Sequence, residues 1–306
     1  MALTLNEASK LSNDILVQGV IETVVRDSPV LQKMPFIEIT GNGLTYNQEN
    51  ALPDIDFYDV GDAWGESTPT FTQLTAALKI MGGDADVDSF LKATRSNIQD
   101  LEVAVIELKA KALRHKFEEA FIYGDNNANS KQFDGIRKLI DTTSASSGVV
   151  AMGATGATLT LDKMDELIDS IKGGKPDMLI MSRRSRRKIS ALVRASGGLV
   201  ETDRDQWGNF VQLWNGVPIG VNDWVLDTHQ LDNSLETDTT GGDCSTIYAV
   251  QVGEDGLCGL SSPGFVQVET VGALETKDAT RTRVKWYTAL ALFSSLKAAA
   301  LIGVQD

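Results

Sequence analysis

The chain has 306 residues, of which 42% are hydrophobic and 23% are charged, and both values are ordinary for a folded globular protein. This composition excludes an intrinsically disordered chain and a fibrous repeat. The formal net charge of −14 argues against a protein whose main task is to grip nucleic-acid phosphates. It leaves open a container with nucleic acid inside, because an acidic inner wall would repel packaged DNA and would not trap it.

The cysteine usage favours a reducing compartment such as the cytoplasm. The two cysteines, Cys244 and Cys258, are too few for a disulfide framework and lack metal-ligand spacing, so we expect two buried thiols. No basic segment followed by an apolar one begins the sequence, so no secretion signal is expected. The apolar stretch 286–304 contains Lys297 and begins with strand-like alternation, which disfavours a membrane span.

Residues 1 to about 35 are predicted to form an arm. Apolar residues recur at roughly helical spacing over residues 6–25, and Pro29 and Pro35 end the pattern. This segment could pack on its own domain or on a partner subunit, and the sequence leaves both open.

A hairpin with a long loop is predicted next. Residues 36–46 and 71–80 alternate as strands do, and the polar connection over residues 50–69 is rich in Asp and Gly. At about 20 residues, this connection is longer than a compact domain normally contains without a use. It carries the aromatic residues Phe57, Tyr58 and Trp64. Aromatic side chains on a polar loop are costly in water, so we expect them to contact another molecule.

The clearest predicted helix runs from residue 96 or 97 to Tyr123, and Gly124 ends it. It carries two apolar stripes on opposite sides. One stripe consists of Leu101, Val105, Leu108 and Ala112, and the other of Val103, Ile106, Leu113, Phe117 and Phe121. A surface helix normally carries one stripe, so we expect this helix to be packed on both sides, as a spine.

A Ser-, Gly-, Ala- and Thr-rich stretch at 142–157 indicates a linker, after which the pattern is α/β. Helices are expected over 161–172 and 182–195, the second capped by Ser182, with a strand over 177–181 between them. Further strands are expected at 210–221, 246–252, 264–270 and 281–293.

No complete catalytic motif is present. The sequence has two histidines, His115 and His229, and neither is accompanied by a serine or cysteine in a nucleophile-elbow motif. We therefore expect a solvated or interface role for His115, and we predict no catalytic residue and no cofactor.

Two acidic patterns resemble parts of calcium loops. Residues 125–129 copy the first alternating ligands of such a loop but lack its glycine turn and closing glutamate. The alternating Asp84, Asp86 and Asp88 lack the same parts. We interpret the first pattern as turn chemistry and the second as one solvated strand face, and we predict no metal site.

A basic run over residues 182–188 lies at the start of the second α/β helix. On a helical wheel, Arg183, Arg184 and Arg187 lie opposite the apolar residues. Three interpretations remain open: a solvated helix face, pairing with acidic groups of a neighbouring subunit, or contact with DNA or RNA. Arginine forks suit carboxylates, and the lack of interleaved aromatic residues disfavours nucleic acid.

The ordered set of elements resembles a tailed-bacteriophage major capsid protein of the Hong Kong 97 fold, over nearly the whole chain. The most specific local match is EEAFIYGD at 118–125, the end of the spine helix, followed by QFDGI at 132–136. Others are MLIMS at 178–182 before a helix, NGVPI at 215–219 before a strand, and the final strand around 284–292.

This resemblance implies an α+β fold made of an N-terminal arm, an extended β-hairpin loop, a spine helix, a peripheral domain and an axial domain. The arm would be residues 1–35 and the extended loop residues 36–85. The peripheral domain, which holds the spine helix, would combine residues 86–154 with 256–306. The axial domain would be residues 155–255.

The function that the resemblance implies is structural: a subunit that assembles with itself, as hexamers and pentamers, into an icosahedral phage head around double-stranded DNA. The extended loop would lie across a neighbouring subunit. The predicted inter-subunit contacts are Phe57, Tyr58, Trp64, Arg183, Arg184 and Arg187.

Other expected partners follow from the same resemblance. A separate scaffolding protein is expected because no long charged helical extension precedes the arm, and a portal and a decoration protein are further candidates. Packaged DNA is expected to make only weak, non-specific contacts, and no membrane is involved. The expected location is the virion, assembled in the host bacterial cytoplasm.

Two alternatives have different functions. An encapsulin, which is the shell protein of a cellular compartment that loads cargo enzymes, would share the fold. A soluble α/β enzyme is the more distant alternative, because it would need a clustered nucleophile, base and orienting group, and no motif supplies them.

Overall fold

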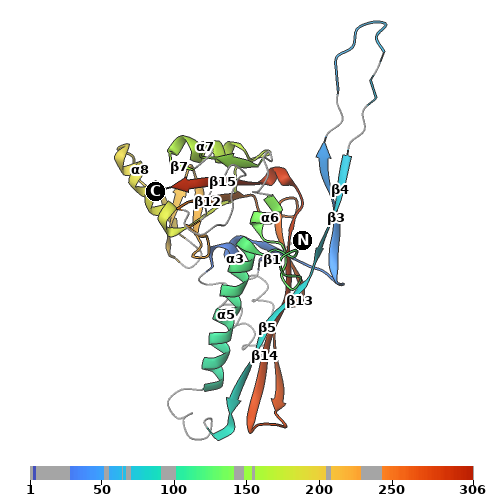
Figure 1. The fold of residues 1–306 in the computed structure, drawn as a ribbon, viewed down its shortest axis with the longest axis vertical. Coiled ribbons are helices and arrows are strands. Elements are labelled where there is room, and N and C mark those ends of the chain that lie inside the picture. Colours follow the sequence, from blue (N-terminus) through green and yellow to red (C-terminus); the bar gives the residue numbers. More distant parts are fainter. Residues whose placement is uncertain are drawn as a thin grey trace.

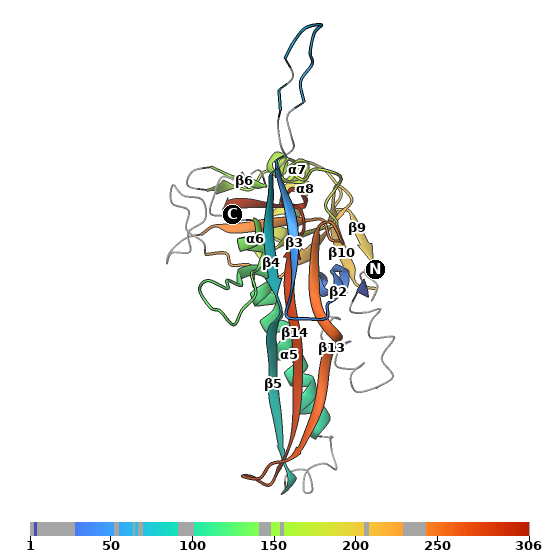
Figure 2. The ribbon, with the colours of Figure 1, turned by 90° about the vertical axis from the view of Figure 1, so that its right-hand side faces the viewer.

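The computed structural model describes residues 3–4, 28–51, 55–63, 65–66, 70–90, 101–140, 148–153, 156–204, 208–228 and 243–305. It has a five-stranded sheet, an eight-stranded sheet and a two-stranded hairpin. Figures 1 and 2 show three parts along the long axis: a lobe, a narrow blade of long strands lined by one helix, and the projecting hairpin.

The lobe is built on the eight-stranded sheet. Its central strands are β8 (Met178–Met181), β11 (Val217–Val221), β12 (Ser245–Val250) and β15 (Ala298–Gln305). Its outer strands are β6 (Val149–Ala151), β7 (Ala157–Thr158), β9 (Thr202–Arg204) and β10 (Phe210–Trp214). Every residue of β8 and β12 is buried, which explains their continuous apolar or small side chains.

Two helices accompany this sheet: α7 (Leu161–Asp169) and α8 (Arg183–Ala195). The helix α8 lies in the connection between the parallel strands β8 and β11, as such a crossover requires. Its start is determined locally, because the Ser182 hydroxyl accepts a hydrogen bond from the backbone N–H of Ser185.

The blade contains the five-stranded sheet and the spine helix, α5 (Leu101–Tyr123). The strands are β1 (Leu3–Thr4), β2 (Pro35–Glu38), β5 (Lys79–Asp88), β13 (Leu257–Ala273) and β14 (Ala279–Leu292), in the order β1-β2-β13-β14-β5. The short helix α3 (Pro29–Lys33) precedes β2, and a 3-10 turn (Ser295–Lys297) links β14 to β15.

An aromatic cluster joins α5 to the blade. Trp286 of β14 is fully buried and stacks on Phe117 of α5, with ring centroids 4.9 Å apart, and Phe36 of β2 lies 5.6 Å from the same indole. The indole Nε1 donates a hydrogen bond to the Ser261 hydroxyl at 3.0 Å. Gly259 makes room for this cluster, because a Cβ there would lie 2.3 Å from the Phe36 ring.

The glycines of the spine-helix motif have a packing role. The backbone N–H of Gly135 donates to the carbonyl of Gly124 at 2.7 Å. A Cβ at Gly124 would lie 2.3 Å from the carbonyl oxygen of Phe133, so only glycine permits this close approach. The turn leads into α6 (Ile136–Ile140).

The predicted hairpin is present, but its bounds differ from the expected strands at 36–46 and 71–80. It consists of β3 (Gly43–Ala51) and β4 (Thr70–Ala77), which pair antiparallel. The ends of the expected loop, 36–85, lie instead in the blade sheet as β2 and β5, because those strands pair with β13 and β14. Figures 1 and 2 show that the hairpin extends past the lobe and carries its loop away from the rest of the molecule.

The structure differs from the sequence prediction at the C-terminal strand. We expected residues 256–306 to lie together in the peripheral domain, but β15 pairs with β12 in the sheet of the lobe. Residues 149–151, expected in the peripheral domain, also lie there as β6, which pairs with β15. The reason is burial: β15 is apolar and small on both faces and is almost completely covered only inside that sheet.

The prediction that α5 is packed on both sides is wrong for the single chain. Ile106, Leu113 and Phe117 are buried against the blade, but Leu108 on the other stripe is 64% exposed and Ala112 is also exposed. One chain has no element to cover the second stripe in the described residues.

Both predicted thiols are free and buried, and burial raises the pKa of Cys258 to about 12. Among the described residues, no group of histidines, cysteines and carboxylates could hold a metal ion. No helix within the described ranges is long and apolar enough to cross a bilayer.

Trp286→Ala is expected to lower the free energy of unfolding of the unassembled subunit by about 3–5 kcal/mol, because it removes a fully buried indole from a close-packed cluster. Trp286→Phe should lose only about 1 kcal/mol, since a ring remains and one hydrogen bond is lost. Urea unfolding followed by circular dichroism measures both. Equal losses for the two variants would contradict the stacking argument.

Candidate inter-subunit surfaces

The loop between β3 and β4 is folded on itself and presents apolar groups outward. The Asp59 carboxylate accepts from the backbone N–H of Val60, and the Asp62 carboxylate accepts from that of Asp59, both at 2.8 Å. The Tyr58 hydroxyl accepts from the N–H of Gly65 at 3.1 Å. Phe57 and Val60 are fully exposed, and Ile55 is 90% exposed. Trp64 lies outside the described residues.

The same loop is strongly acidic. Residues 49–66 contain no lysine or arginine. Their acidic residues are Glu49, Asp54, Asp56, Asp59, Asp62 and Glu66. A surface that accepts this loop therefore needs to be apolar and positively charged at once.

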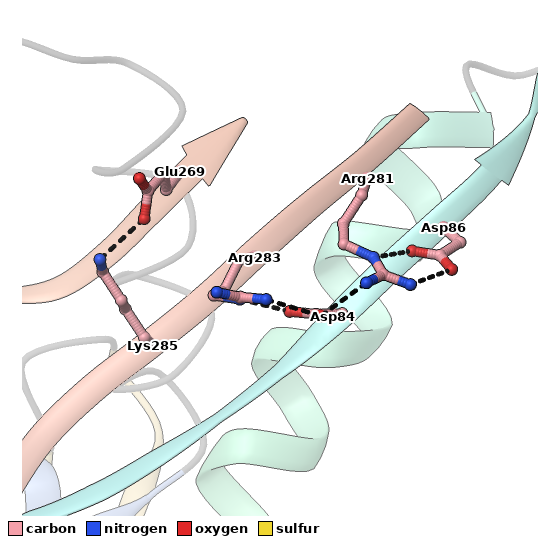
Figure 3. Close-up of polar contacts among 6 residues, drawn as sticks. All are labelled: Asp84, Asp86, Glu269, Arg281, Arg283 and Lys285. Carbon is pink, nitrogen blue, oxygen red and sulfur yellow. Dashed lines mark hydrogen bonds and ion pairs between the residues drawn. The ribbon is translucent and has the colours of Figure 1, made fainter. Parts of the chain in front are cut away.

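A ladder of ion pairs crosses the outer face of the blade (Figure 3). Arg281 of β14 faces Asp86 of the neighbouring β5 and donates two hydrogen bonds, at 2.6 and 2.8 Å. Arg283 faces Asp84 in the same way, at 2.6 and 3.0 Å. Such fork-to-fork pairs are directional as well as attractive, so they hold the register of β5 against β14.

The ladder continues to the third long strand, where the Lys285 ammonium of β14 donates to Glu269 of β13 at 2.7 Å. Hydrogen bonds from Arg283 and Arg281 hold the pKa values of Asp84 and Asp86 below their usual range. We had interpreted the aspartates of β5 only as a solvated strand face. The signal that could have found the pairs is the matching alternation of Arg281, Arg283 and Lys285 in the sequence.

The arginines at the start of α8 have partners within their own chain. Arg183 makes a two-pronged contact with Asp223, at 2.5 and 2.6 Å. Arg184 donates to the backbone carbonyl of Asp243. Arg187 is exposed. Two of the three predicted contact arginines are thus paired within their own chain. The helix α8, which carries them, lies on the side of the lobe away from the hairpin (Figure 1).

The remaining sequence motifs have local structural roles. The Asp125 carboxylate accepts from the backbone N–H of Asn127 at 2.8 Å and from the Lys138 ammonium, which confirms turn chemistry. The His115 ring is exposed and packs edge-on against Trp224. His229 lies outside the described residues.

Comparison with known families identifies the chain. Residues 26–236 match the family described as SU10 major capsid protein. The chain belongs to the SU10 major capsid protein family. This match covers more than half of the sequence and includes the hairpin, the spine helix and most of the lobe, so the chain is a capsid subunit with a structural role. No curated protein matches the sequence.

Solved structures show the fold of this SU10-family chain. A capsid of a native GTA particle has 14% identity and a TM-score of 0.64, over 92% of this chain and 90% of that one. A chain described as Mycobacterium phage Bobi has 14% identity and a TM-score of 0.59, over 93% of this chain and 90% of that one. The SrpI encapsulin of Synechococcus elongatus PCC 7942 has 18% identity and a TM-score of 0.67, over 100% and 97%. The predicted Hong Kong 97-like fold is confirmed.

The ladder gives the blade a pH dependence. The pKa values of Asp84 and Asp86 are lowered by folding, so the pairs stabilise the protein above the unfolded-state pKa of about 3.9 and this stability is lost as the pH falls. Between pH 6 and about pH 3, the double variant Asp84→Asn, Asp86→Asn should therefore lose less stability than the unchanged protein. Urea unfolding at several pH values measures this.

Asp88→Asn is the matched control, because Asp88 lies on the same strand opposite Ala279, and asparagine keeps the side-chain oxygen that accepts from the backbone N–H of Phe90 at 2.9 Å. It should follow the unchanged protein. Parallel curves for the double variant and the unchanged protein would contradict a ladder that forms in solution.

Proposed function

We propose that this chain is the major shell subunit of a phage head, assembling as hexamers and pentamers into an icosahedral shell around double-stranded DNA, without enzymatic activity of its own. The observation that carries the proposal is the hairpin loop: a member of a capsid family exposes Ile55 and Phe57 there, and no described part of its own chain covers them. Apolar groups on a projecting loop gain free energy only against another molecule.

In this proposal, the parts of the chain divide as follows. Residues 1–34 form the arm. The extended loop is the hairpin of β3 and β4 with its connection, within residues 39–78, because β2 and β5 on either side of it belong to the blade sheet. The peripheral domain holds the spine helix and the blade, and the axial domain is built on the lobe, including β15 at 298–305. The loop lies across a neighbouring copy, where Phe57, Tyr58 and Trp64 make contacts, and Arg187 is the α8 residue best placed for another.

The proposed partners are further copies of the chain, a separate scaffolding protein, a portal and a decoration protein. The net charge of −14 supports weak, non-specific contact with the packaged DNA. Assembly would take place in the host bacterial cytoplasm, and the finished shell would be part of the virion.

An encapsulin-type compartment is the second candidate, and one observation favours it: the likeness to the SrpI encapsulin covers the whole chain. The family match favours the phage head, since it is to a major capsid protein. The contents of native particles separate the two. A nuclease-protected DNA genome supports a phage head, and a protein cargo without DNA supports a compartment.

The purified chain, alone and with its scaffolding protein, is expected to form shells, capsomers or tubes tens of nanometres across because every subunit surface is repeated in the assembly. Negative-stain electron microscopy with light scattering measures this. A monomer or dimer that persists at high concentration and with scaffold added would overturn the capsid proposal.

Phe57→Ser is expected to reduce shell formation while it changes the stability of the unassembled subunit by less than about 0.5 kcal/mol, because Phe57 contacts nothing when fully exposed. Light scattering measures assembly and urea unfolding measures stability. The matched control is Phe210→Ser, an exposed phenylalanine on the lobe, which should leave assembly closer to normal. Normal assembly of Phe57→Ser would remove this residue from the interface.

A further inference from the structure

The hairpin of β3 and β4 joins the blade through two short connections. Leu78 alone separates β4 from β5, and residues 39–42 separate β2 from β3. The backbone N–H of Leu78 donates to the carbonyl of Asn42 at 3.0 Å, and Gly41 has a φ of +131°, which favours glycine. A two-stranded ribbon can swing about two such connections, so its direction depends on side-chain contacts at its base.

The base of the hairpin lies on the turn and helix that follow the spine helix. A cavity of about 120 Å³ lies between them, and we name this place the hairpin seam. Tyr46 and Ala76 line the cavity from the hairpin, and Phe133 and Leu139 line it from the other side. Because the seam encloses unfilled space, it holds the hairpin by a few contacts and not by close packing.

Tyr46 supplies an apolar contact across the seam. Its ring packs edge-on against Phe293, with ring centroids 4.9 Å apart and ring planes at 63°. Burial raises the pKa of the Tyr46 hydroxyl, and a hydrogen bond with the backbone of Leu292 opposes this shift. This one side chain therefore ties β3 of the hairpin to the end of β14.

Lys79 supplies a polar contact at the point where the hairpin meets β5. Its ammonium donates to the Asn126 side-chain oxygen at 2.8 Å and to the Ser130 carbonyl at 2.7 Å. Asn126 is itself held, because its backbone N–H donates to the Asp134 carboxylate at 2.8 Å. Asp134 in turn pairs with Lys138 of α6 at 2.8 Å. The contacts therefore run from the base of the hairpin to α6.

A small rotation at the seam has a large effect on the loop. Figures 1 and 2 show the hairpin extending from the seam past the lobe. Because a strand rises about 3.4 Å per residue, a tilt of about 20° displaces a point ten residues along it by roughly 12 Å. The contacts at the seam therefore determine where the loop lies.

We propose that Tyr46 and Lys79 are positioning residues for assembly: together they hold the hairpin in one direction relative to the blade before a second copy is present. Tyr46 restrains β3, and Lys79 restrains the end of β4 where it continues into β5. The proposal rests on the proposed function and adds how the loop is aimed. A hairpin that is ordered in advance costs less free energy to immobilise on assembly than one that swings.

Spin-label distance measurements on the unassembled subunit test the aiming. Gln73→Cys on β4 and Asp169→Cys at the end of α7 provide exposed labelling sites, and the two native cysteines are buried. The intact seam is expected to give one narrow distance distribution. The further changes Tyr46→Ala and Lys79→Ala should make it roughly twice as wide, because the hairpin then swings about its two connections.

The matched control combines Tyr46→Phe with Lys131→Ala. Tyr46→Phe keeps the ring against Phe293, and Lys131 is an exposed lysine beside Ser130, so the distribution should stay narrow. Lys79→Ala alone removes a partly exposed side chain and should widen the distribution in part, which keeps the test valid if the double variant unfolds.

Two results would overturn the aiming. One is a distribution as narrow in Tyr46→Ala, Lys79→Ala as in the intact chain, which is the result of a role in stability alone. The other is equal widening in the control. Both can be read without assembly, so they leave the capsid function standing.

Assembly measures the consequence of the aiming. The Tyr46→Ala, Lys79→Ala variant is expected to need about fivefold more protein for half-maximal shell formation, because ordering the hairpin then opposes assembly. Light scattering measures this. A wide distance distribution with an unchanged half-maximal concentration overturns the positioning role. An unchanged chain that never assembles, alone or with scaffold, would instead refute the proposed function itself.

Discussion

The stacking of Trp286 on Phe117 is the contact on which the rest of the structure depends. It joins the spine helix to the long strand β14, and Phe36 joins the strand that follows the arm to the same cluster. Three segments that are far apart in sequence therefore share one buried centre. Because the indole also donates a hydrogen bond to Ser261, its orientation is determined as well as its burial.

From that centre the blade extends as three long strands. Its outer face is exposed, so the burial of apolar side chains cannot determine the strand register there. Paired charges supply the register there instead: Arg281 and Arg283 lie directly opposite Asp86 and Asp84. Each exposed pair contributes little stability, but a slip of one residue would move all of these side chains to the other face. The ladder thus suits a long, thin element that has to keep its shape.

The subunit buries its own apolar core but leaves apolar side chains exposed on its outlying surfaces. The lobe and the inner face of the blade are well packed, whereas the hairpin loop and the second stripe of α5 expose apolar groups. The hairpin loop and α5 lie in opposite halves of the molecule along its long axis (Figure 1), as expected for a member of a capsid family whose contacts form between copies.

The sequence by itself determined the local elements: the spine helix, the cap at Ser182, the hairpin and the aromatic loop follow from periodicity, capping chemistry and turn composition. The glycine motif after α5 was recognised by its resemblance to the Hong Kong 97 pattern, and the structure supplies its physical reason, since only glycine permits that backbone approach. Tertiary structure alone decided that β15 joins the lobe, that one stripe of α5 stays exposed, and that the aspartates of β5 meet the arginines of β14. Each of these depends on which segments, distant in sequence, come together, and local periodicity carries no information about that choice.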